Sequence, residues 1–182
     1  GFHGHTYPGA TAPYGAVQLS PDTRKGNWDA CSGYHYSDST LMGFSHTHLS
    51  GTGCIDLGDI LFRPSLQTPL AFSHSDEKAS PGYYSVNLRE AGVLAELTTT
   101  PHVGIHRYTY KKGIESTLVV DMDHLLDNEY IYEGWVKQTG ENELTGMRRT
   151  RGWVDNQYVF FVAQFSQPFS SMEQPSERQA VL

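Results

Sequence analysis

Cysteine is scarce in this sequence: among 182 residues, only Cys31 and Cys54 are present. Two cysteines permit one disulfide at most, and they do not form a zinc-binding pattern. The residues leave open whether the two are bridged or remain separate thiols, so they do not indicate a cellular compartment. A structural zinc site is therefore not expected.

Long apolar runs are also missing. No stretch approaches the roughly 20 apolar residues that cross a bilayer, so we expect no membrane span. The chain does not open with the charged-then-apolar leader of a secretory signal. We expect that such a signal was removed or was never present.

Basic residues are few: 13 lysines and arginines stand against 20 aspartates and glutamates, which gives a net charge of −7. Because phosphate binding needs a clustered basic surface, nucleic acid is not expected as a partner. We interpret the one dense basic spot, Arg148, Arg149 and Arg151, as a solvated face. A phosphate-binding loop, a dinucleotide fingerprint and a serine elbow are absent, which removes most kinase, dehydrogenase and hydrolase functions from consideration.

Helical periodicity is lacking too, whereas apolar and polar residues alternate with period two along most of the chain. Aromatic residues reach 12%, and lysine and glutamate are sparse, which suits strands. We therefore predict an all-β fold: an antiparallel β-sandwich of Greek-key or supersandwich type, with long irregular N-terminal loops and little helix. One short helix is expected at His74–Lys78. The expected strands are Gly15–Leu19, Leu41–Ser45, Leu57–Phe62, Leu70–Ser73, Tyr83–Leu88, Val93–Thr98, Ile105–Tyr110, Ser116–Asp121, Tyr130–Lys137, Glu143–Arg149 and Tyr158–Phe165.

The amino-terminal third, Gly1 to Asp59, is rich in Gly, His, Ser, Thr and Pro and poor in apolar runs. Long irregular segments in compact domains usually carry function, so we expect the functional residues in this third. At the other end, Ala180-Val181-Leu182 resembles the start of another strand. We therefore expect the chain to be part of a longer one.

The segment from Gly43 to Asp59 concentrates polar chemistry. If Phe44 to Leu49 is extended, His46 and His48 project from the same face. The loop that follows, Ser50-Gly51-Thr52-Gly53, can expose backbone N–H groups, because glycine lets the chain approach a ligand closely. This pattern predicts the wall of a polar binding site.

Two other interpretations of these histidines stay open. With Asp56 and Asp59, His46 and His48 could bind a divalent metal ion. Alternatively, one imidazole caps a buried carboxylate and the other is solvated. Hydrogen bonding to a ligand hydroxyl is the interpretation that we favour.

A second cluster lies around Trp28-Asp29 and Cys31. An indole offers apolar contact to the C–H face of a sugar, and a carboxylate accepts strong hydrogen bonds from its hydroxyls. The alternative is that Trp28 is a core aromatic and Asp29 a turn residue.

Several longer motifs together resemble glycoside hydrolase family 92, the calcium-dependent exo-acting α-mannosidases. The resemblance spans essentially the whole chain, and its longest run, Gly43 to Gly53, is highly specific. The other matching segments are His3 to Ala10, Pro13 to Thr23, Ser32-Gly33-Tyr34, Pro81 to Tyr84, His106-Arg107-Tyr108 and Gly152-Trp153.

This resemblance implies that residues 1–182 are an amino-terminal β-sandwich domain, itself incomplete, and that an (α/α)6-barrel domain absent from this chain follows it. That domain would supply the catalytic carboxylates and most calcium ligands, so no catalytic or metal-binding residue is assigned here. The sandwich would form one wall of a mannose pocket, through residues matched as Trp28, Asp29, Cys31, His46, His48, Gly51, Thr52 and Gly53.

The implied enzyme removes terminal α-linked mannose from glycans with inversion and works in the periplasm or outside the cell. Its partners are mannose-containing glycans and the helical domain, and we expect this chain alone to be inactive. The alternative from another class is a free-standing carbohydrate-binding β-sandwich.

Overall fold

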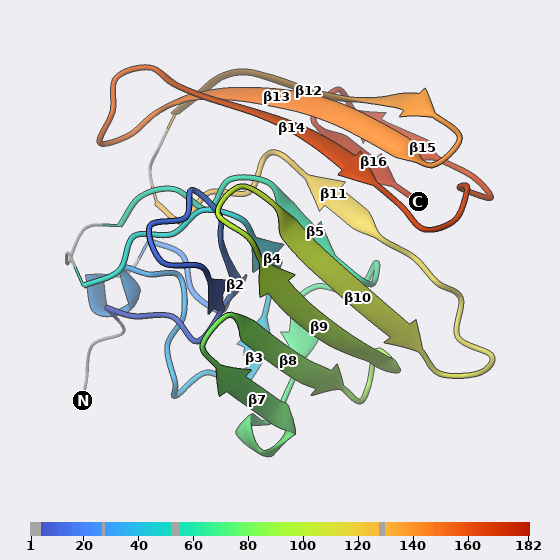
Figure 1. Cartoon of the computed structure of the whole chain (residues 1–182), viewed down its shortest axis with the longest axis horizontal. Coiled ribbons are helices and arrows are strands. Elements are labelled where there is room, and N and C mark those ends of the chain that lie inside the picture. Colours follow the sequence, from blue (N-terminus) through green and yellow to red (C-terminus); the bar gives the residue numbers. More distant parts are fainter. Residues whose placement is uncertain (1–4, 27, 52–54, 128–129) are drawn as a thin grey trace.

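The computed structural model describes residues 5–26, 28–51, 55–127 and 130–182. Within these ranges the chain forms short strands and two single-turn 3-10 helices, η1 and η2 (Figure 1). In chain order they are β1 (Ala10–Thr11), β2 (Gln18–Asp22), η1 (Trp28–Ala30), β3 (Thr40–Leu41), β4 (Gly43–Ser45), β5 (Leu61–Arg63), β6 (Leu70–Ala71), η2 (His74–Asp76), β7 (Glu77–Ser80), β8 (Tyr83–Leu88), β9 (Val93–Thr99), β10 (Gly104–Tyr110), β11 (Val119–Asp121), β12 (Tyr130–Gly140), β13 (Glu143–Arg151), β14 (Gln157–Gln164), β15 (Glu173–Ser176) and β16 (Gln179–Val181).

The strands form three main sheets. A seven-stranded sheet has the order β1-β2-β4-β5-β11-β16-β15, a four-stranded sheet the order β10-β9-β8-β7, and a three-stranded sheet the order β12-β13-β14. The neighbouring strands pair antiparallel, as in β8 with β9 and β13 with β14. The predicted all-β antiparallel sandwich is confirmed.

Two apolar clusters hold these sheets together. In the first, Leu19 and Phe44 of the seven-stranded sheet pack with Tyr84, Val86 and Leu97 of the four-stranded sheet. In the second, the other half of the seven-stranded sheet packs on the three-stranded sheet, through Phe62, Val120, Met122, Val136 and Leu144. Tyr108 on β10 packs against both clusters. In Figure 1 the β12–β14 sheet lies above β11 and β5, and β7–β10 lie in front.

The strand expected at Leu57–Phe62 is confirmed only at its end, since β5 starts at Leu61. Leu57, Gly58 and Ile60 all have positive φ angles, of 74°, 84° and 58°, which a strand does not accommodate. Because of this irregular backbone, the residues from Leu57 to Ile60 do not form a regular strand.

The helix expected at His74–Lys78 is also shorter than predicted. Ser73 caps the single turn η2, and the chain continues directly into strand β7 from Glu77. The strand expected at the C-terminal end is confirmed as β16, which pairs with β11 through Val119 and Val181.

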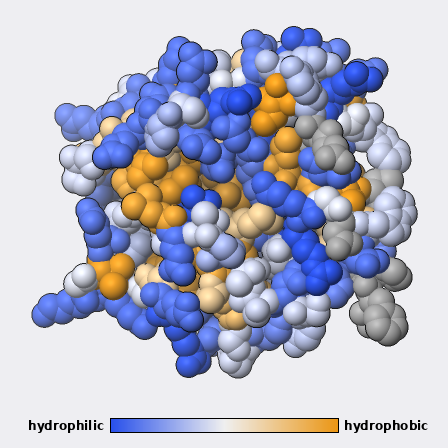
Figure 2. Space-filling view, turned by 180° about the vertical axis from the view of Figure 1, so that it is seen from behind, coloured by the Kyte–Doolittle hydropathy of each residue, from blue (hydrophilic) through white to orange (hydrophobic). Residues whose placement is uncertain are grey.

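Among the residues described, no helix is long and apolar enough to cross a membrane. The face seen from behind is largely hydrophilic, with a few separate apolar patches (Figure 2). On β14 the outward side chains Tyr158, Phe160 and Val162 are exposed, while the residues between them turn toward the second cluster.

Candidate functional site

Hydrogen bonds gather four irregular segments around the ends of β2, β11 and β13. The N–H of Gly26 donates to the carbonyl of Leu126 at 2.5 Å. The N–H of Trp153 donates to Asp56 Oδ2 at 2.7 Å. The first bond joins the loop that carries Trp28 to the turn after β11, and the second joins the loop after His48 to the turn after β13. Asp56, Asp127 and Trp153, from three of these four segments, line one pocket.

Asp22 is the buried centre of this region. Its Oδ1 accepts a hydrogen bond from His48 Nε2 and its Oδ2 accepts one from His124 Nε2, both at 2.7 Å. Burial by itself would raise the pKa of Asp22, but the charges of, and hydrogen bonds from, His48 and His124 outweigh burial and hold that pKa well below its usual range. A buried carboxylate with two ring donors ties β2 to both neighbouring loops.

His48 is fully engaged inside the protein. Its Nδ1 lies 2.7 Å from the carbonyl oxygen of Gln18, and its Nε2 faces Asp22 and, at 3.0 Å, Ser45 Oγ. The interpretation in which an imidazole caps a buried carboxylate therefore describes His48, although the carboxylate is Asp22 and not a residue of the same segment.

His46 has a different set of partners. Its Nδ1 donates to the carbonyl oxygen of Ile60 at 2.6 Å, and its Nε2 lies 3.0 Å from Nε2 of His106. Since a carbonyl only accepts, the proton of His46 sits on Nδ1, and His106 must donate across the second contact. His106 Nδ1 then accepts from the Tyr108 hydroxyl at 2.8 Å. Burial lowers the pKa of His46 to about 4 and that of His106 well below 6.5.

The condition that Phe44 to Leu49 is one extended segment is not met, because β4 ends at Ser45 and His48 forms only an isolated bridge with Leu57. His46 and His48 therefore do not form a joint face of free imidazoles. The idea that either ring touches a substrate stays a prediction.

Arg148 contradicts the interpretation of a solvated basic face. The side chain is fully buried: its Nε donates to Asp59 Oδ1 at 2.9 Å, and Nη1 donates to the carbonyls of Met122 and His124. Asp59 Oδ2 also accepts from Thr47 Oγ1 at 2.7 Å. The position of Arg148 on β13 explains why its side chain is buried, because Leu144 lies on the same inward face four residues earlier.

Trp28 and Asp29 lie at the surface in η1. Trp28 is 63% exposed, so the alternative that it is a core aromatic is wrong. Asp29 is partly buried. Cys31 is buried, and its Sγ donates to the carbonyl oxygen of Trp28 at 2.8 Å. This contact stabilises the single turn η1.

The glycine loop is only partly visible. Gly51 is exposed at a φ of 76°, and its N–H donates to the carbonyl of His5. Thr52, Gly53 and Cys54 lie outside the described residues, so the predictions that fall on them stay predictions.

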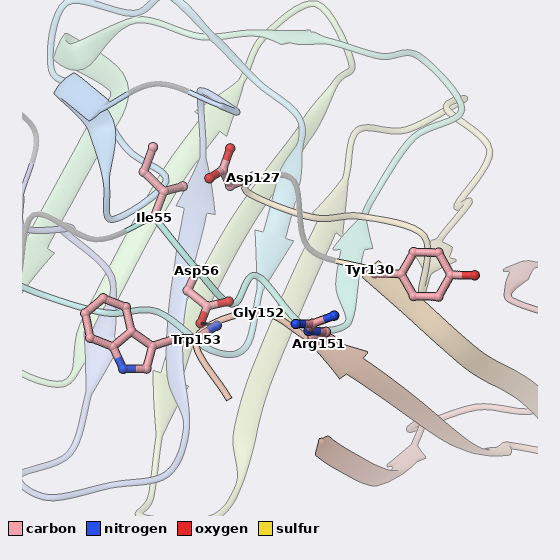
Figure 3. A pocket seen from close by; sticks show the side chains of 7 residues that line it. All are labelled: Ile55, Asp56, Asp127, Tyr130, Arg151, Gly152 and Trp153. Carbon is pink, nitrogen blue, oxygen red and sulfur yellow. Dashed lines mark hydrogen bonds between the residues drawn. The ribbon is translucent and has the colours of Figure 1, made fainter. Parts of the chain in front are cut away.

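A pocket of about 380 Å³ opens in the same region (Figure 3). The sequence drew attention to some of its residues, but not to the pocket as a whole. Residues from three separate stretches of the chain line it: Ile55, Asp56, Asp127, Tyr130, Arg151, Gly152 and Trp153. In this view the carboxylate of Asp56 lies between the indole of Trp153 and the guanidinium of Arg151. The Gly152-Trp153 match was the one signal in the sequence that could have directed attention to it.

The metal interpretation finds no support in this geometry. Within the described ranges, no three side chains of His, Cys, Asp or Glu are arranged to hold a metal ion. His48 and Asp59 are bound to groups of the fold, and both oxygens of Asp56 accept backbone N–H groups.

Known proteins resemble the chain over most or all of its length. The model of the glycosyl hydrolase family 92 N-terminal domain matches residues 1–180. Two structures of a family GH92 α-mannosidase from Bacteroides thetaiotaomicron, one in complex with mannoimidazole, are 35% identical, with a TM-score of 0.88 over 98% of this chain. The GH92 family glycosyl hydrolase ccman5 is 26% identical, with a TM-score of 0.79 over 100% of the chain. An uncharacterized secreted glycosidase of Arthroderma benhamiae is 28% identical over 146 residues, 69% of the chain.

The chain spans only part of these relatives. It covers 27% and 28% of the chains of the two structures of the Bacteroides enzyme, 28% of ccman5 and 19% of the secreted glycosidase. Most of each relative therefore lies outside the region that this chain matches.

Proposed function

The chain belongs to glycosyl hydrolase family 92, whose N-terminal domain it matches, and from this premise we propose that it forms one wall of the mannose pocket of an α-mannosidase. The similarity to an α-mannosidase that binds mannoimidazole supports this assignment. Because the chain covers about a quarter of that enzyme, the remaining polypeptide must supply the rest of the pocket.

The observation that carries the proposal is the exposed indole of Trp28 next to the partly buried Asp29, on a turn fixed by Cys31. The indole can pack on the C–H face of a pyranose, and the carboxylate can accept hydrogen bonds from its hydroxyls. The buried hydrogen bond between Asp22 and His124 joins the end of β2 to the turn after β11, beside the loop that carries Trp28. A rigid support of this kind positions a substrate, which can account for a large part of a catalytic barrier.

The chemical step belongs to the remaining polypeptide in this proposal. Hydrolysis with inversion uses an acid and a base about 6.5–9.5 Å apart, with a water molecule between the base and the sugar. No residue of this chain is assigned to either role, and we expect the isolated chain to release no mannose above a blank. Calcium would likewise be held mainly by the remaining polypeptide, as the family resemblance implies; among the described residues, no three His, Cys, Asp or Glu side chains are arranged to hold a metal ion.

The proposed partners follow from the same argument. They are mannose-containing glycans and an (α/α)6 domain that follows in the same polypeptide. The relative that is named a secreted glycosidase supports a location outside the cytoplasm, either secreted or periplasmic.

The test is kinetic and uses the full-length enzyme. Trp28→Ala and Asp29→Ala should each lower kcat/KM for mannose release at least about tenfold, which corresponds to roughly 1.4 kcal/mol of transition-state stabilisation. Leu66→Ala is the control, because Leu66 is also an exposed apolar side chain but lies on the connection between β5 and β6. If both test variants keep the wild-type kcat/KM, this part of the chain serves the fold only.

A further inference from the structure

The pocket at Trp153 has features of a built site that the proposed mannose wall does not use. The indole of Trp153 is 73% exposed, whereas Asp56 beside it is only 5% exposed. Asp56 Oδ2 accepts the N–H of Trp153 at 2.7 Å, and Oδ1 accepts the N–H of Leu57 at 2.9 Å. A nearly buried carboxylate thus fixes the backbone that presents an exposed indole.

The opposite side of the pocket is supported by the three-stranded sheet. Tyr130 at the start of β12 lies directly across from Arg151 at the end of β13. Within the described part of the chain, Arg151 pairs with the exposed Asp155 at 3.4 Å, and a guanidinium with five N–H donors can serve a further partner as well. Gly152 donates to the carbonyl of Val154 at 3.2 Å, which closes the turn that carries Trp153.

These groups suit an uncharged polyhydroxylated ring. An indole packs on apolar C–H surface, a carboxylate with unused lone pairs accepts from hydroxyls, and a guanidinium donates to ring or hydroxyl oxygens. Among the described lining residues, the carboxylates of Asp56 and Asp127 outnumber the guanidinium of Arg151, so phosphate or carboxylate ligands would meet net negative charge there. A volume of about 380 Å³ lies at the small end of ligand pockets and suits a single sugar ring.

The pocket also lies next to the loop that carries Trp28. Asp127 lines the pocket, and its Oδ1 lies 3.9 Å from where a Cβ on Gly26 would stand. Gly26 is two residues before Trp28. The pocket and the turn that carries Trp28 are therefore built on neighbouring segments.

We propose that the Trp153 pocket binds a second sugar of the same glycan, a neighbour of the mannose that is released. This inference rests on the proposed function and deepens it, because it assigns to this chain a share in choosing the oligosaccharide. Trp153 supplies the stacking surface, and Asp56 and Arg151 supply the polar contacts.

The experiment compares two substrates of the full-length enzyme. An α-linked mannotriose can fill both positions, whereas α-mannosyl fluoride carries no second sugar. Trp153→Ala should lower kcat/KM for mannotriose at least tenfold more than for the fluoride, and Trp153→Phe should restore most of the difference because an aromatic ring remains. Phe160→Ala, an aromatic that is 70% exposed on β14 outside the pocket, is the matched control and should shift both substrates alike.

Equal losses on the two substrates, or no loss, would overturn the inference. Equal losses with a lowered melting temperature would instead mean that the pocket docks another part of the polypeptide. Titration of tryptophan fluorescence with mannotriose separates this proposal from the proposed function. If neither substrate is hydrolysed but the wild type still responds to mannotriose and Trp153→Ala does not, the pocket stands and the proposed function fails; if the wild type does not respond, both fail.

Discussion

The guanidinium of Arg148 and the carboxylate of Asp59 form an ion pair at 2.6 Å in which both side chains are fully buried, although the residues are 89 positions apart. The pair joins β13 to the segment between His48 and β5. Two buried charges are costly to desolvate, and the cost is offset only where further hydrogen bonds satisfy them. Met122, Thr47 and Gln157 supply such bonds here. The pair therefore fixes the loop that carries Asp56 against the sheet that carries Arg151.

Arg148→Met should destabilise the chain by about 3–5 kcal/mol, because it leaves the Asp59 carboxylate buried without its cation. Urea unfolding followed by circular dichroism measures the change. The same substitution at Arg107 is the matched control: Arg107 pairs with Glu96 through a similar two-nitrogen contact, but on the surface. We expect little change from Arg107→Met. Equal effects of the two substitutions would show that burial of the Arg148 pair is unimportant.

Gly33 tests the tightness of packing around Asp22. Its φ is +78°, and an added Cβ would lie 2.5 Å from Asp22 Oδ1. Gly82 has nearly the same φ, +75°, but a Cβ added at Gly82 would have no other atom within 4 Å. Gly82→Ala should cost only the left-handed strain, about 1–2 kcal/mol, and Gly33→Ala should cost that plus about 1–3 kcal/mol of overpacking. The two free energies of unfolding, measured in urea, should differ accordingly; a difference near zero would mean that the Asp22 carboxylate moves freely aside.

The histidine pair predicts how stability depends on pH. Burial lowers the pKa of His46 from 6.5 to about 4, and burial together with His46 lowers that of His106 well below 6.5. Between pH 6.5 and 4 the unfolded chain therefore binds more protons than the folded chain. The free energy of unfolding should fall as the pH falls through this window, by up to about 1.4 kcal/mol per pH unit for each histidine.

His106→Gln should reduce this slope, because one of the imidazoles whose pKa is lowered by burial is gone. His102→Gln replaces an exposed histidine near the start of β10 and should leave the slope as it is in the wild type. Urea unfolding at half-unit steps of pH gives the slope for each variant. A slope in His106→Gln as steep as that of the wild type would contradict the role given to this ring.

Much of the strand framework could be predicted from alternation, because inward and outward side chains differ most where one face is buried. Tyr83–Leu88 was predicted with the bounds of β8, and Val93–Thr98 differs from β9 by one residue. The segment before β5 could not be predicted this way. Leu57 and Ile60 hold positive φ angles that non-glycine residues rarely adopt, and the long-range contacts that impose them leave no local pattern.

The candidate site divides along the same line. The exposure of Trp28 agrees with the sugar interpretation, which local chemistry suggested. The partners of His46 and His48 could not be read from the sequence, because His106 and Asp22 lie 60 and 26 positions away. Arg148 could have been identified: it shares the inward parity of Leu144, and an arginine at such a position indicates a buried partner.

Removal of calcium should separate the roles of this chain and of the remaining polypeptide. Since the described residues offer no group of three metal-binding side chains, a chelator such as EDTA should leave the melting temperature of the 182-residue chain unchanged. The same treatment should abolish mannose release by the full-length enzyme, and added calcium should restore it, because we propose that the ion is held mainly outside this chain. Differential scanning calorimetry of the chain and a mannose-release assay of the enzyme give the two readouts. A melting temperature of the isolated chain that falls with EDTA and recovers with calcium would place a ligand set within these 182 residues and contradict the assignment.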